Sequence, residues 1–376
     1  MTRISSALAL AVCLALATVN TVSGENGRAT IRVRPTQTIQ DALNTAPAGA
    51  KVIVDAGTYY ENLEIKTDGI ELVARDNNVK LIAPQTYKSN ICSGLAGPNT
   101  EAGICIHGSG IELEEFTDIS EHRGFIGATK LIRGVSVTGF EIKDFSGLSV
   151  AIVAGQDTQV SRNTFVNGQR YGTLSLGSKN SKVSRNVVSS TDPKLLFIGI
   201  CVSDQKDARV SDNNISGYST ALCVQTSGAE IRNNDVTGCC TGAFIDPGIV
   251  GAQIRGNHIG ANDPRCFNPE LGGKGTAFGI IVFGANDTIV RDNVITGQTL
   301  PEGADPNDPK LAAYGILVTD FVFPPYPNVA ASGNQVKRNT VTGNTFDILV
   351  GGSGPGNVGK DNVCNSAFPG DACTAP

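Results

Sequence analysis

Four side chains are the strongest candidates for acid–base chemistry. Asp246 supplies a carboxylate that could remove a proton from a substrate, and Tyr314, Lys194 and Arg265 supply donors that could polarise a carbonyl. The residues around Asp246 are apolar, which suits loss of water from an apolar precursor better than chemistry on a charged polymer. Whether the four side chains meet depends on the elements that carry them.

Metal and triad patterns are weak by comparison. His107, His122 and His258 match no metal-ligand spacing, and no Ser-His-Asp or Cys-His order can be assembled. An acidic turn at 302–308 could hold calcium, but such a turn is more typical of a solvated loop. We therefore predict neither a metal nor another cofactor.

A repeated Asn organises the chain. Segments such as V-S-D-N-N-I, I-R-N-N-D-V and I-R-G-N-H-I place it before an aliphatic residue, at a base step of 21 to 23 residues. The series is Asn163, Asn186, Asn213, Asn234, Asn257, Asn293, Asn339 and Asn362. Stacked coils would join these side chains in a ladder and their aliphatic neighbours in a core. The sequence therefore predicts an all-β parallel β-helix, since the L-x-x-L-x-L run of a leucine-rich repeat is absent.

The first strand of each coil defines a surface on which a ligand could bind. In G-I-C-V-S-D we expect Ile and Val to point inward, so the third and fifth residues point outward. The third-position row is Ile152, Ser175, Cys201, Cys223, Phe244, Ile281, Leu317 and Leu349. The fifth-position row is Ala154, Gly177, Ser203, Gln225, Asp246, Phe283, Thr319 and Gly351. From this mostly apolar stripe we predict ligand contacts by Cys201, Gln225, Phe244, Ile281, Phe283, Leu317 and Thr319.

Long insertions interrupt the coils where they could flank this stripe. They cover 189–197, 260–277, 297–314 and 321–333. The first three precede a first strand and would bring Lys194, Arg265 and Tyr314 to the groove edge. Insertions of this length in an economical solenoid are typical of functional loops, and shielding of apolar strands is the alternative.

The N-terminus has the features of a secretory signal peptide at residues 1–24, with an apolar run at 7–17. The remaining residues, 25–376, are expected to form a single domain and to be secreted. A net charge of -5 gives no basic surface for nucleic acid, and no later segment suits a membrane span. We expect an apolar or aromatic small molecule as partner, and the oligomeric state stays open. The sequons at Asn214 and Asn286 fall at predicted turns and are expected to be glycosylated.

Nine cysteines remain after the predicted signal peptide. The expected pairs are Cys92 with Cys105, Cys364 with Cys373, and Cys266 with Cys240 or Cys239. Cys201 and Cys223 occupy one strand position on adjacent coils, about 4.8 Å apart, which is also within disulfide range. The odd number predicts one free thiol, and the tail 364–376 is expected to be tied by its disulfide.

The N-terminal cap, expected at 30–60, carries a resemblance to a known superfamily. Residues 38–46 form an amphipathic segment with Ile39, Ala42, Leu43 and Ala46 on one face, followed by a G-T-Y-Y-E turn. This arrangement resembles the start of the pectin-lyase-like, right-handed parallel β-helix superfamily. The resemblance covers roughly residues 30 to 365 and implies the fold with a capping helix, whereas the superfamily's activities differ widely.

The chain lacks the known catalytic motifs of the superfamily's polysaccharide-active enzymes. The polygalacturonase set, the pectate lyase Arg-x-Pro-x-x-Arg segment and the D-P-H run of alginate epimerases are absent, and the chain has no Trp for the Arg-Pro-Trp segment of pectin methylesterases. A lyase or epimerase with another motif set remains one alternative. A non-catalytic binding or cell-wall protein is the other.

The apolar stripe between loops favours an enzyme for an apolar small molecule. In this respect the chain looks like the secreted cyclases of fungal natural-product pathways, in particular the hetero-Diels–Alderases. That resemblance implies dehydration to a quinone methide, with Asp246 as base, followed by cycloaddition in an apolar groove.

Overall fold

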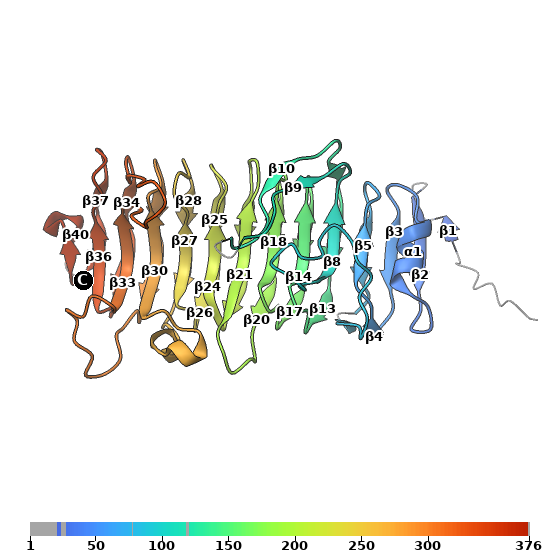
Figure 1. Cartoon of the computed structure of the whole chain (residues 1–376), viewed down its shortest axis with the longest axis horizontal. Helices are drawn as coiled ribbons and strands as arrows, with labels where there is room; N and C mark the ends of the chain where they lie inside the picture. Colours follow the sequence, from blue (N-terminus) through green and yellow to red (C-terminus); the bar gives the residue numbers. More distant parts are fainter. Residues whose placement is uncertain (1–20, 24–27, 77, 118–119, 375–376) are drawn as a thin grey trace, which may run out of the picture.

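The chain is a parallel β-helix of three long sheets whose strands stack along one axis (Figure 1). The computed structural model describes residues 21–23, 28–76, 78–117 and 120–374. The predicted signal peptide, apart from residues 21–23, lies outside the described residues. Within the described part, no helix is long and apolar enough to cross a membrane.

Each complete coil contributes one strand to each sheet in turn. Sheet I contains β5 Leu63–Ile65, β8 Ala102–His107, β14 Leu148–Val153, β18 Tyr171–Leu176, β21 Leu196–Ser203, β24 Tyr218–Val224, β27 Thr241–Ile245, β30 Thr276–Phe283, β33 Ala312–Thr319, β36 Phe346–Val350 and β39 Ala367–Phe368. Sheet II contains β1 Thr21–Ser23, β2 Ala29–Val33, β3 Lys51–Val54, β6 Glu71–Ala74, β12 Ser136–Thr138, β16 Gln159–Ser161, β19 Lys182–Ser184, β22 Arg209–Ser211, β25 Glu230–Arg232, β28 Gln253–Arg255, β31 Ile289–Arg291, β34 Gln335–Lys337 and β37 Val358–Lys360. Sheet III contains β4 Gly57–Tyr60, β7 Val79–Ile82, β13 Phe140–Lys143, β17 Thr164–Val166, β20 Val187–Ser189, β23 Asn214–Ser216, β26 Asp235–Thr237, β29 His258–Ile259, β32 Val294–Thr296, β35 Thr340–Thr342, β38 Asn362–Cys364 and β40 Cys373–Thr374.

The remaining elements lie in connections and at the ends of the solenoid. They are α1 Ile39–Thr45, the strands β9 Glu112–Leu113, β10 Phe125–Gly127, β11 Ile132–Arg133 and β15 Gly155–Gln156, and the short helices η1 Pro264–Phe267, η2 Pro269–Leu271 and η3 Gly370–Ala372. The main strand pairs are parallel, for example β21 with β24. The β1–β2 pair is antiparallel.

The Asn series forms one continuous ladder between sheets II and III. The Nδ2 of each Asn from Asn163 to Asn339 donates to the Oδ1 of the next at 2.9–3.2 Å, and Asn362 donates to the carbonyl of Ala372 at 2.9 Å. All eight side chains are buried. The predicted Asn ladder and the predicted all-β, parallel β-helix fold are therefore confirmed.

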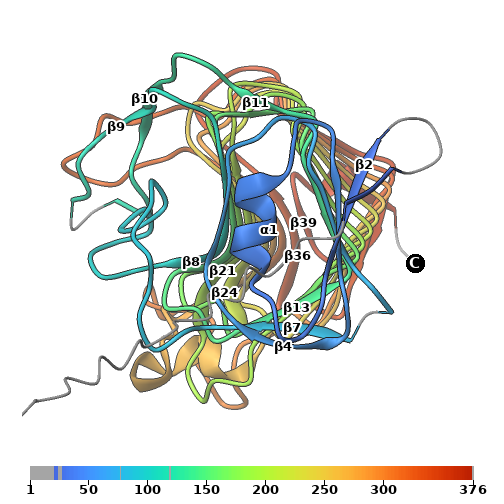
Figure 2. The ribbon, with the colours of Figure 1, turned by 90° about the vertical axis from the view of Figure 1, so that its right-hand side faces the viewer.

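The helix α1 closes the N-terminal end of the solenoid (Figure 2). Ile39, Ala42, Leu43 and Ala46 are buried against the first coils, as the spacing predicts. The carboxylate of Glu61, in the G-T-Y-Y-E turn, accepts from the backbone N–H groups of Ile39 at 2.8 Å and Gln40 at 3.0 Å. This carboxylate satisfies two N-terminal donors of the helix, so it holds the cap on the first coil.

Two loops cover the N-terminal half of the outer face of sheet I. We call residues 84–101 the first covering loop and 108–131 the second, which the structure describes except for 118 and 119. Their apolar residues, including Leu95 and Phe125, pack with outward side chains of β14, β18 and β21 in a second core outside the solenoid. The strands beneath are therefore apolar on both faces.

This second core corrects the predicted register of two coils. Leu174 pairs with both Ala151 and Cys201, so Ala151 and Leu174 belong to the outward row. Ile152 lies in the central core, and Ser175 donates to the interior carboxylate of Asp204 at 2.8 Å. From Cys201 onward the predicted outward rows are correct.

The cysteines in the described part of the chain form four disulfides. The pairs are Cys92–Cys105, Cys201–Cys223, Cys240–Cys266 and Cys364–Cys373. Among the described residues Cys239 is the free cysteine, and burial raises its pKa to about 12. Cys240, next to Cys239 in the chain, is thus the partner of Cys266.

Candidate functional site

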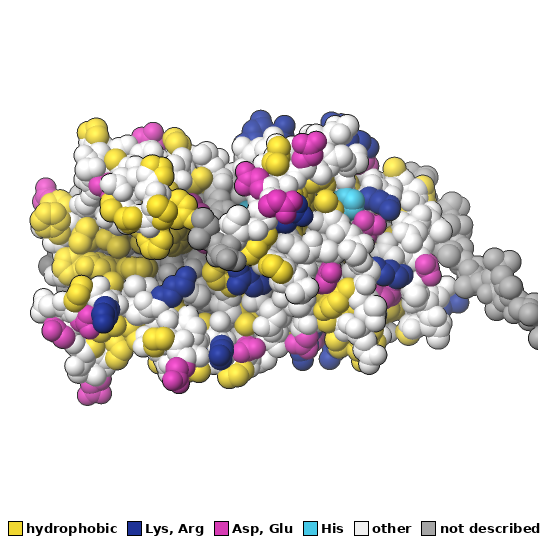
Figure 3. All heavy atoms as spheres, in the orientation of Figure 1, with side chains coloured by type: hydrophobic (Ala, Val, Ile, Leu, Met, Phe, Trp, Pro, Cys, Tyr) yellow, Lys and Arg dark blue, Asp and Glu magenta, His cyan; other side chains and the backbone are white. Residues whose placement is uncertain are grey.

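The C-terminal half of the outer face of sheet I is open and apolar. We call this surface the trough and define it by the outward residues of β27, β30, β33 and β36 together with Asp246 after β27. They are Phe244, Asp246, Phe278, Ile281, Phe283, Tyr314, Leu317, Thr319, Phe346 and Leu349. Figure 3 shows hydrophobic side chains gathered at this end of the molecule, between protruding loops.

Aromatic rings line both long edges of the trough. On one edge Tyr314 lies between Phe278, with ring centroids 6.3 Å apart, and Phe346, at 5.5 Å. On the other edge Phe283 contacts Phe244 at 5.8 Å and Phe321 of the adjoining loop at 5.1 Å. Ile281 and Leu317 lie between these edges on β30 and β33. The floor can therefore contact a flat or ring-shaped apolar molecule from several sides.

A pair of carboxylates lies where the trough meets the second covering loop. The oxygens of Glu121, on that loop, and Asp246 come within 4.8 Å of one another. The side-chain amide of Gln225 joins them: its Nε2 donates to Glu121 at 2.9 Å and to Asp246 at 2.6 Å. His122 Nε2 lies 2.9 Å from the Oε1 of the same Gln225.

The environment of Asp246 favours its protonated form. Burial raises the pKa of Asp246 well above its usual range, and the negative charge of Glu121 raises it further, while the Gln225 hydrogen bond acts in the opposite direction. A partly buried acid with a raised pKa beside a second carboxylate is an arrangement suited to general acid catalysis. The structure thus favours proton donation by Asp246 over the proton removal expected from the sequence.

The structure does not bring the other three predicted catalytic residues to Asp246. Asp246 lies opposite Phe283, whereas Tyr314 pairs with Phe278, so the two residues are two strands apart, about 10 Å, and a further 16 Å or so apart along the strands. The guanidinium of Arg265 is bound to Asp263 at 2.7 Å and to the carbonyl of Asp192 at 3.0 Å. Arg265 thus links two rim loops.

Lys194 is exposed on the rim loop at 190–195. Its backbone N–H donates to the carboxylate of Asp192 at 2.9 Å. The carbonyl of the preceding residue, Pro193, accepts from Arg265, so Lys194 lies on the same rim as Arg265.

The predicted contact residues divide between two environments. Phe244, Ile281, Phe283, Leu317 and Thr319 lie in the trough, and Gln225 adjoins it. Cys201, in contrast, is fully buried beneath the covering loops and is bonded to Cys223, so it does not face the trough.

The two sequon asparagines also differ in exposure. Asn214 is exposed at the start of β23, on the outer face of sheet III. Asn286 is partly buried, and its Oδ1 accepts from Ser332 at 2.6 Å. Asn214 is therefore the more accessible of the two expected glycosylation sites.

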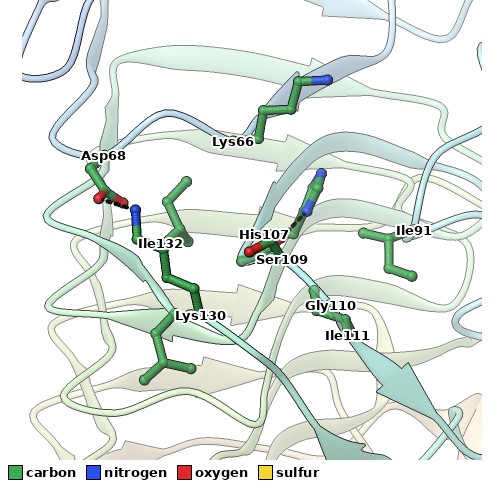
Figure 4. Close-up of a pocket in the computed structure, with 11 residues that line it drawn as sticks. Lys66, Asp68, Ile91, His107, Ser109, Gly110, Ile111, Lys130 and Ile132 are labelled. Carbon is green, nitrogen blue, oxygen red and sulfur yellow. Dashed lines mark hydrogen bonds and ion pairs between the residues drawn. The ribbon is translucent and has the colours of Figure 1, made fainter.

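A second candidate site is a cavity of about 400 Å³ at the N-terminal end of sheet I (Figure 4). Aliphatic side chains line it together with His107, Lys66 and Lys130. His107 Nε2 lies 2.9 Å from Glu64, and its Nδ1 lies 2.6 Å from the Gly108 carbonyl. Burial opposes ionisation of Glu64, but its hydrogen bonds to His107 and Lys66 outweigh burial and lower the pKa of Glu64.

Four residues of the sites escaped the sequence analysis for two reasons. Glu121 and His122 lie on an insertion, and no repeat position indicates where an insertion docks. Phe278 and Phe346 follow the repeat, because each stands, like Tyr314, two residues before an inward Ile of sheet I. Simple strand alternation would have placed both side chains inward, on the side of that Ile, so the outward rows could not have found them.

Comparisons with known proteins identify the fold. Residues 198–374 match the family described as right handed beta helix region, and residues 86–267 match that described as periplasmic copper-binding protein (NosD). The chain thus has the right-handed parallel β-helix fold. A search of curated protein sequences found no match.

Solved structures share this fold at low sequence identity. The alginate lyase of Paenibacillus sp. str. FPU-7 is 13% identical over 82% of this chain and 95% of its own, with a TM-score of 0.52. The DFA-IIIase of Arthrobacter chlorophenolicus A6, solved without its lid, is 13% identical over 89% and 98%, with a TM-score of 0.54. PfbA, a surface adhesin of Streptococcus pneumoniae, is 13% identical over 89% and 85%, with a TM-score of 0.50. These names include both a lyase and an adhesin, so the fold alone leaves the activity open.

Proposed function

We propose that the protein is a secreted enzyme that binds an apolar or aromatic small molecule in the trough and uses Asp246 as a general acid. The observation that carries the proposal is the position of Asp246, a carboxyl whose pKa is raised by burial and by Glu121, beside an aromatic and aliphatic floor. Outward side chains of β30, β33 and β36 offer few polar groups to a sugar polymer. The four disulfides suit an oxidising compartment.

The reaction that best suits these groups is dehydration followed by cycloaddition, as in a hetero-Diels–Alderase. Asp246 donates its proton to the hydroxyl of an ortho-hydroxybenzylic alcohol, and the carbon–oxygen bond breaks to release water. Glu121 accepts the phenolic proton, which leaves a neutral quinone methide. A bound alkene then adds across the quinone methide, forming one carbon–carbon and one carbon–oxygen bond without loss of atoms. The proton returns from Glu121 to Asp246, which completes the cycle.

The trough contributes to this reaction by holding both partners. Orientation of two reactants on one surface makes a bimolecular step effectively unimolecular, which can contribute roughly 7–11 kcal/mol at best. The aromatic edges exclude water from the short-lived quinone methide, so the alkene rather than water adds to it.

A direct test uses a simple surrogate reaction. The mature protein is incubated with ortho-hydroxybenzyl alcohol and an excess of an apolar vinyl ether, and the chroman adduct is measured by chromatography and mass spectrometry. We expect faster adduct formation with the protein than with Asp246→Asn. Equal rates with wild-type protein, Asp246→Asn and buffer across apolar benzylic alcohols of increasing size would refute the proposal.

The cavity in Figure 4 favours a second candidate, a polysaccharide lyase or epimerase. Lys66 is ion-paired with Glu64 at 3.2 Å and Lys130 with Asp68 at 2.7 Å, so either lysine would have to exchange its partner to neutralise a uronate carboxylate. His107 could then remove the adjacent proton. This candidate ranks second because both ring nitrogens of His107 already face acceptors. Incubation with polyuronates distinguishes it, since a lyase releases unsaturated products that absorb in the ultraviolet.

A further inference from the structure

Two residues of the second covering loop are anchored to sheet I at the carboxylate pair. His122 is buried, and its Nε2 lies 2.9 Å from Gln225 Oε1 while its Nδ1 lies 2.8 Å from the Arg123 carbonyl. The hydroxyl of the buried Tyr171 donates to the backbone carbonyl of Glu121 at 3.0 Å. Glu121 and His122 are thus held by a strand residue of β18 and by Gln225, which follows β24.

Gln225 connects the second covering loop to Asp246 through hydrogen bonds. Its amide nitrogen donates to both carboxylates, and its oxygen faces His122, so every polar atom of the side chain is used. Because Glu121 and His122 are neighbours in the chain, a displacement of His122 from Gln225 also moves the Glu121 carboxylate away from Asp246. The same displacement would admit water to Asp246.

We propose that Gln225 and His122 are positioning residues that couple docking of the second covering loop to protonation of Asp246. When the loop is docked, Asp246 is partly buried, faces Glu121 and keeps its proton. When the loop is undocked, Asp246 becomes an ordinary solvated carboxylate and cannot serve as an acid. This inference rests on the proposed function of Asp246, and it adds control of the acid by a loop distant in sequence.

The coupling predicts that docking of the second covering loop weakens as the pH rises. Burial and Glu121 raise the pKa of Asp246 in the docked state, so a proton on Asp246 stabilises docking. Docking is therefore strongest below the usual pKa of an aspartate and weakens as the pH rises through the raised pKa. The titratable groups that face the site are Glu121, His122 and Tyr171, whereas Cys223 is in a disulfide and does not titrate.

Two measurements on the full-length mature protein test the coupling without any substrate. Carbon-13 NMR of labelled Asp carboxyls follows the pKa of Asp246, and hydrogen exchange follows the backbone amides of residues 120–127. The variants are His122→Ala and His122→Gln, whose amide can again donate to Gln225. The buried Asp204, whose pKa is also raised, is the internal control, because it is bonded to Ser175, Ser178 and Ser181 inside the solenoid.

We expect His122→Ala to lower the pKa of Asp246 toward its usual range and to speed exchange at 120–127 by about tenfold. His122→Gln should restore both, and Asp204 should titrate unchanged in each protein. An unchanged Asp246 titration in His122→Ala, or faster exchange without a change at Asp246, overturns the coupling. An ordinary pKa for Asp246 in the wild-type protein overturns the proposed acid itself, so the two failures are distinguishable.

Discussion

Glu121 and Asp246, from an insertion and from the repeat respectively, place their carboxylate oxygens within 4.8 Å of each other. Two negative charges at this separation in a partly dry site repel strongly, so the pair favours a state that shares one proton. The repeat alone supplies Asp246, whose pKa is raised first by burial, and the insertion supplies the negative charge of Glu121 that raises it further.

The Asn ladder should contribute measurably to stability. In Asn234→Leu, Asn213 loses its acceptor and Asn257 loses one of its two donors in a buried turn, so the free energy of unfolding should fall by roughly 1–3 kcal/mol. Denaturant unfolding measures the change, and Gln253→Leu on the exposed edge of β28 is the matched control. An unfolding midpoint for Asn234→Leu equal to that of the control would contradict the ladder's role.

Thiol counting should find a single reactive cysteine. Denatured, unreduced mature protein should react with one equivalent of a thiol reagent, because Cys239 is the free cysteine of the described chain. The native protein should react far more slowly, since Cys239 is buried and its pKa is about 12. Cys239→Ala should abolish the denatured-state signal. A larger number of thiols would contradict the disulfide set.

Asp204 should make the protein less stable at high pH. Burial raises its pKa, so its contribution to folding is full below the usual pKa of an aspartate and is lost as the pH rises through the raised value. The wild-type protein should therefore lose unfolding free energy as the pH rises above the usual pKa of an aspartate and through the raised value, and Asp204→Asn should lose less over the same range. Identical pH profiles for the two proteins would show that the serine hydrogen bonds keep Asp204 ionised.

The proposed acid should affect turnover more than binding. Asp246→Asn keeps the shape of the side chain but cannot protonate a leaving hydroxyl, so formation of the chroman adduct should fall by about 10²–10⁴-fold. Binding of an apolar ligand should change little. A variant that binds and turns over like the wild-type protein would remove Asp246 from the mechanism.

Much of the scaffold could be predicted from the sequence because each copy of the repeat corresponds to one coil of the solenoid. The Asn series predicted the ladder, and the G-T-Y-Y-E turn and its helix predicted the cap. The register failed at Ile152 and Ser175 because the strands β14 and β18 are buried on both faces, and alternation of apolar and polar residues then gives no inside or outside.

The site was less predictable than the scaffold for a physical reason. Phe244, Phe283 and Asp246 follow the strand period, so the sequence places them on one face. Glu121 and His122 depend on where an insertion folds back, which is decided by tertiary packing against Tyr171 and Gln225. Tyr314 and Arg265 were predicted to act with Asp246, but sequence spacing does not give the distance between the start of a strand or a loop and the end of another strand. The structure was needed to show that they lie apart from Asp246.

The most direct test of the account is whether the trough binds an apolar molecule. Fluorescence titration with the neutral dye Nile red can be carried out on the wild-type protein and on Phe244→Asp, Phe283→Asp and Val294→Asp, the last being an exposed control on sheet III. A carboxylate in the trough must lose water when the dye binds, so Phe244→Asp and Phe283→Asp should each weaken binding by about tenfold or more. Val294→Asp should bind like the wild-type protein, and all three variants should unfold within about 1 kcal/mol of it. Equal dye affinity in all four proteins would contradict the proposal that the trough is the ligand-binding site.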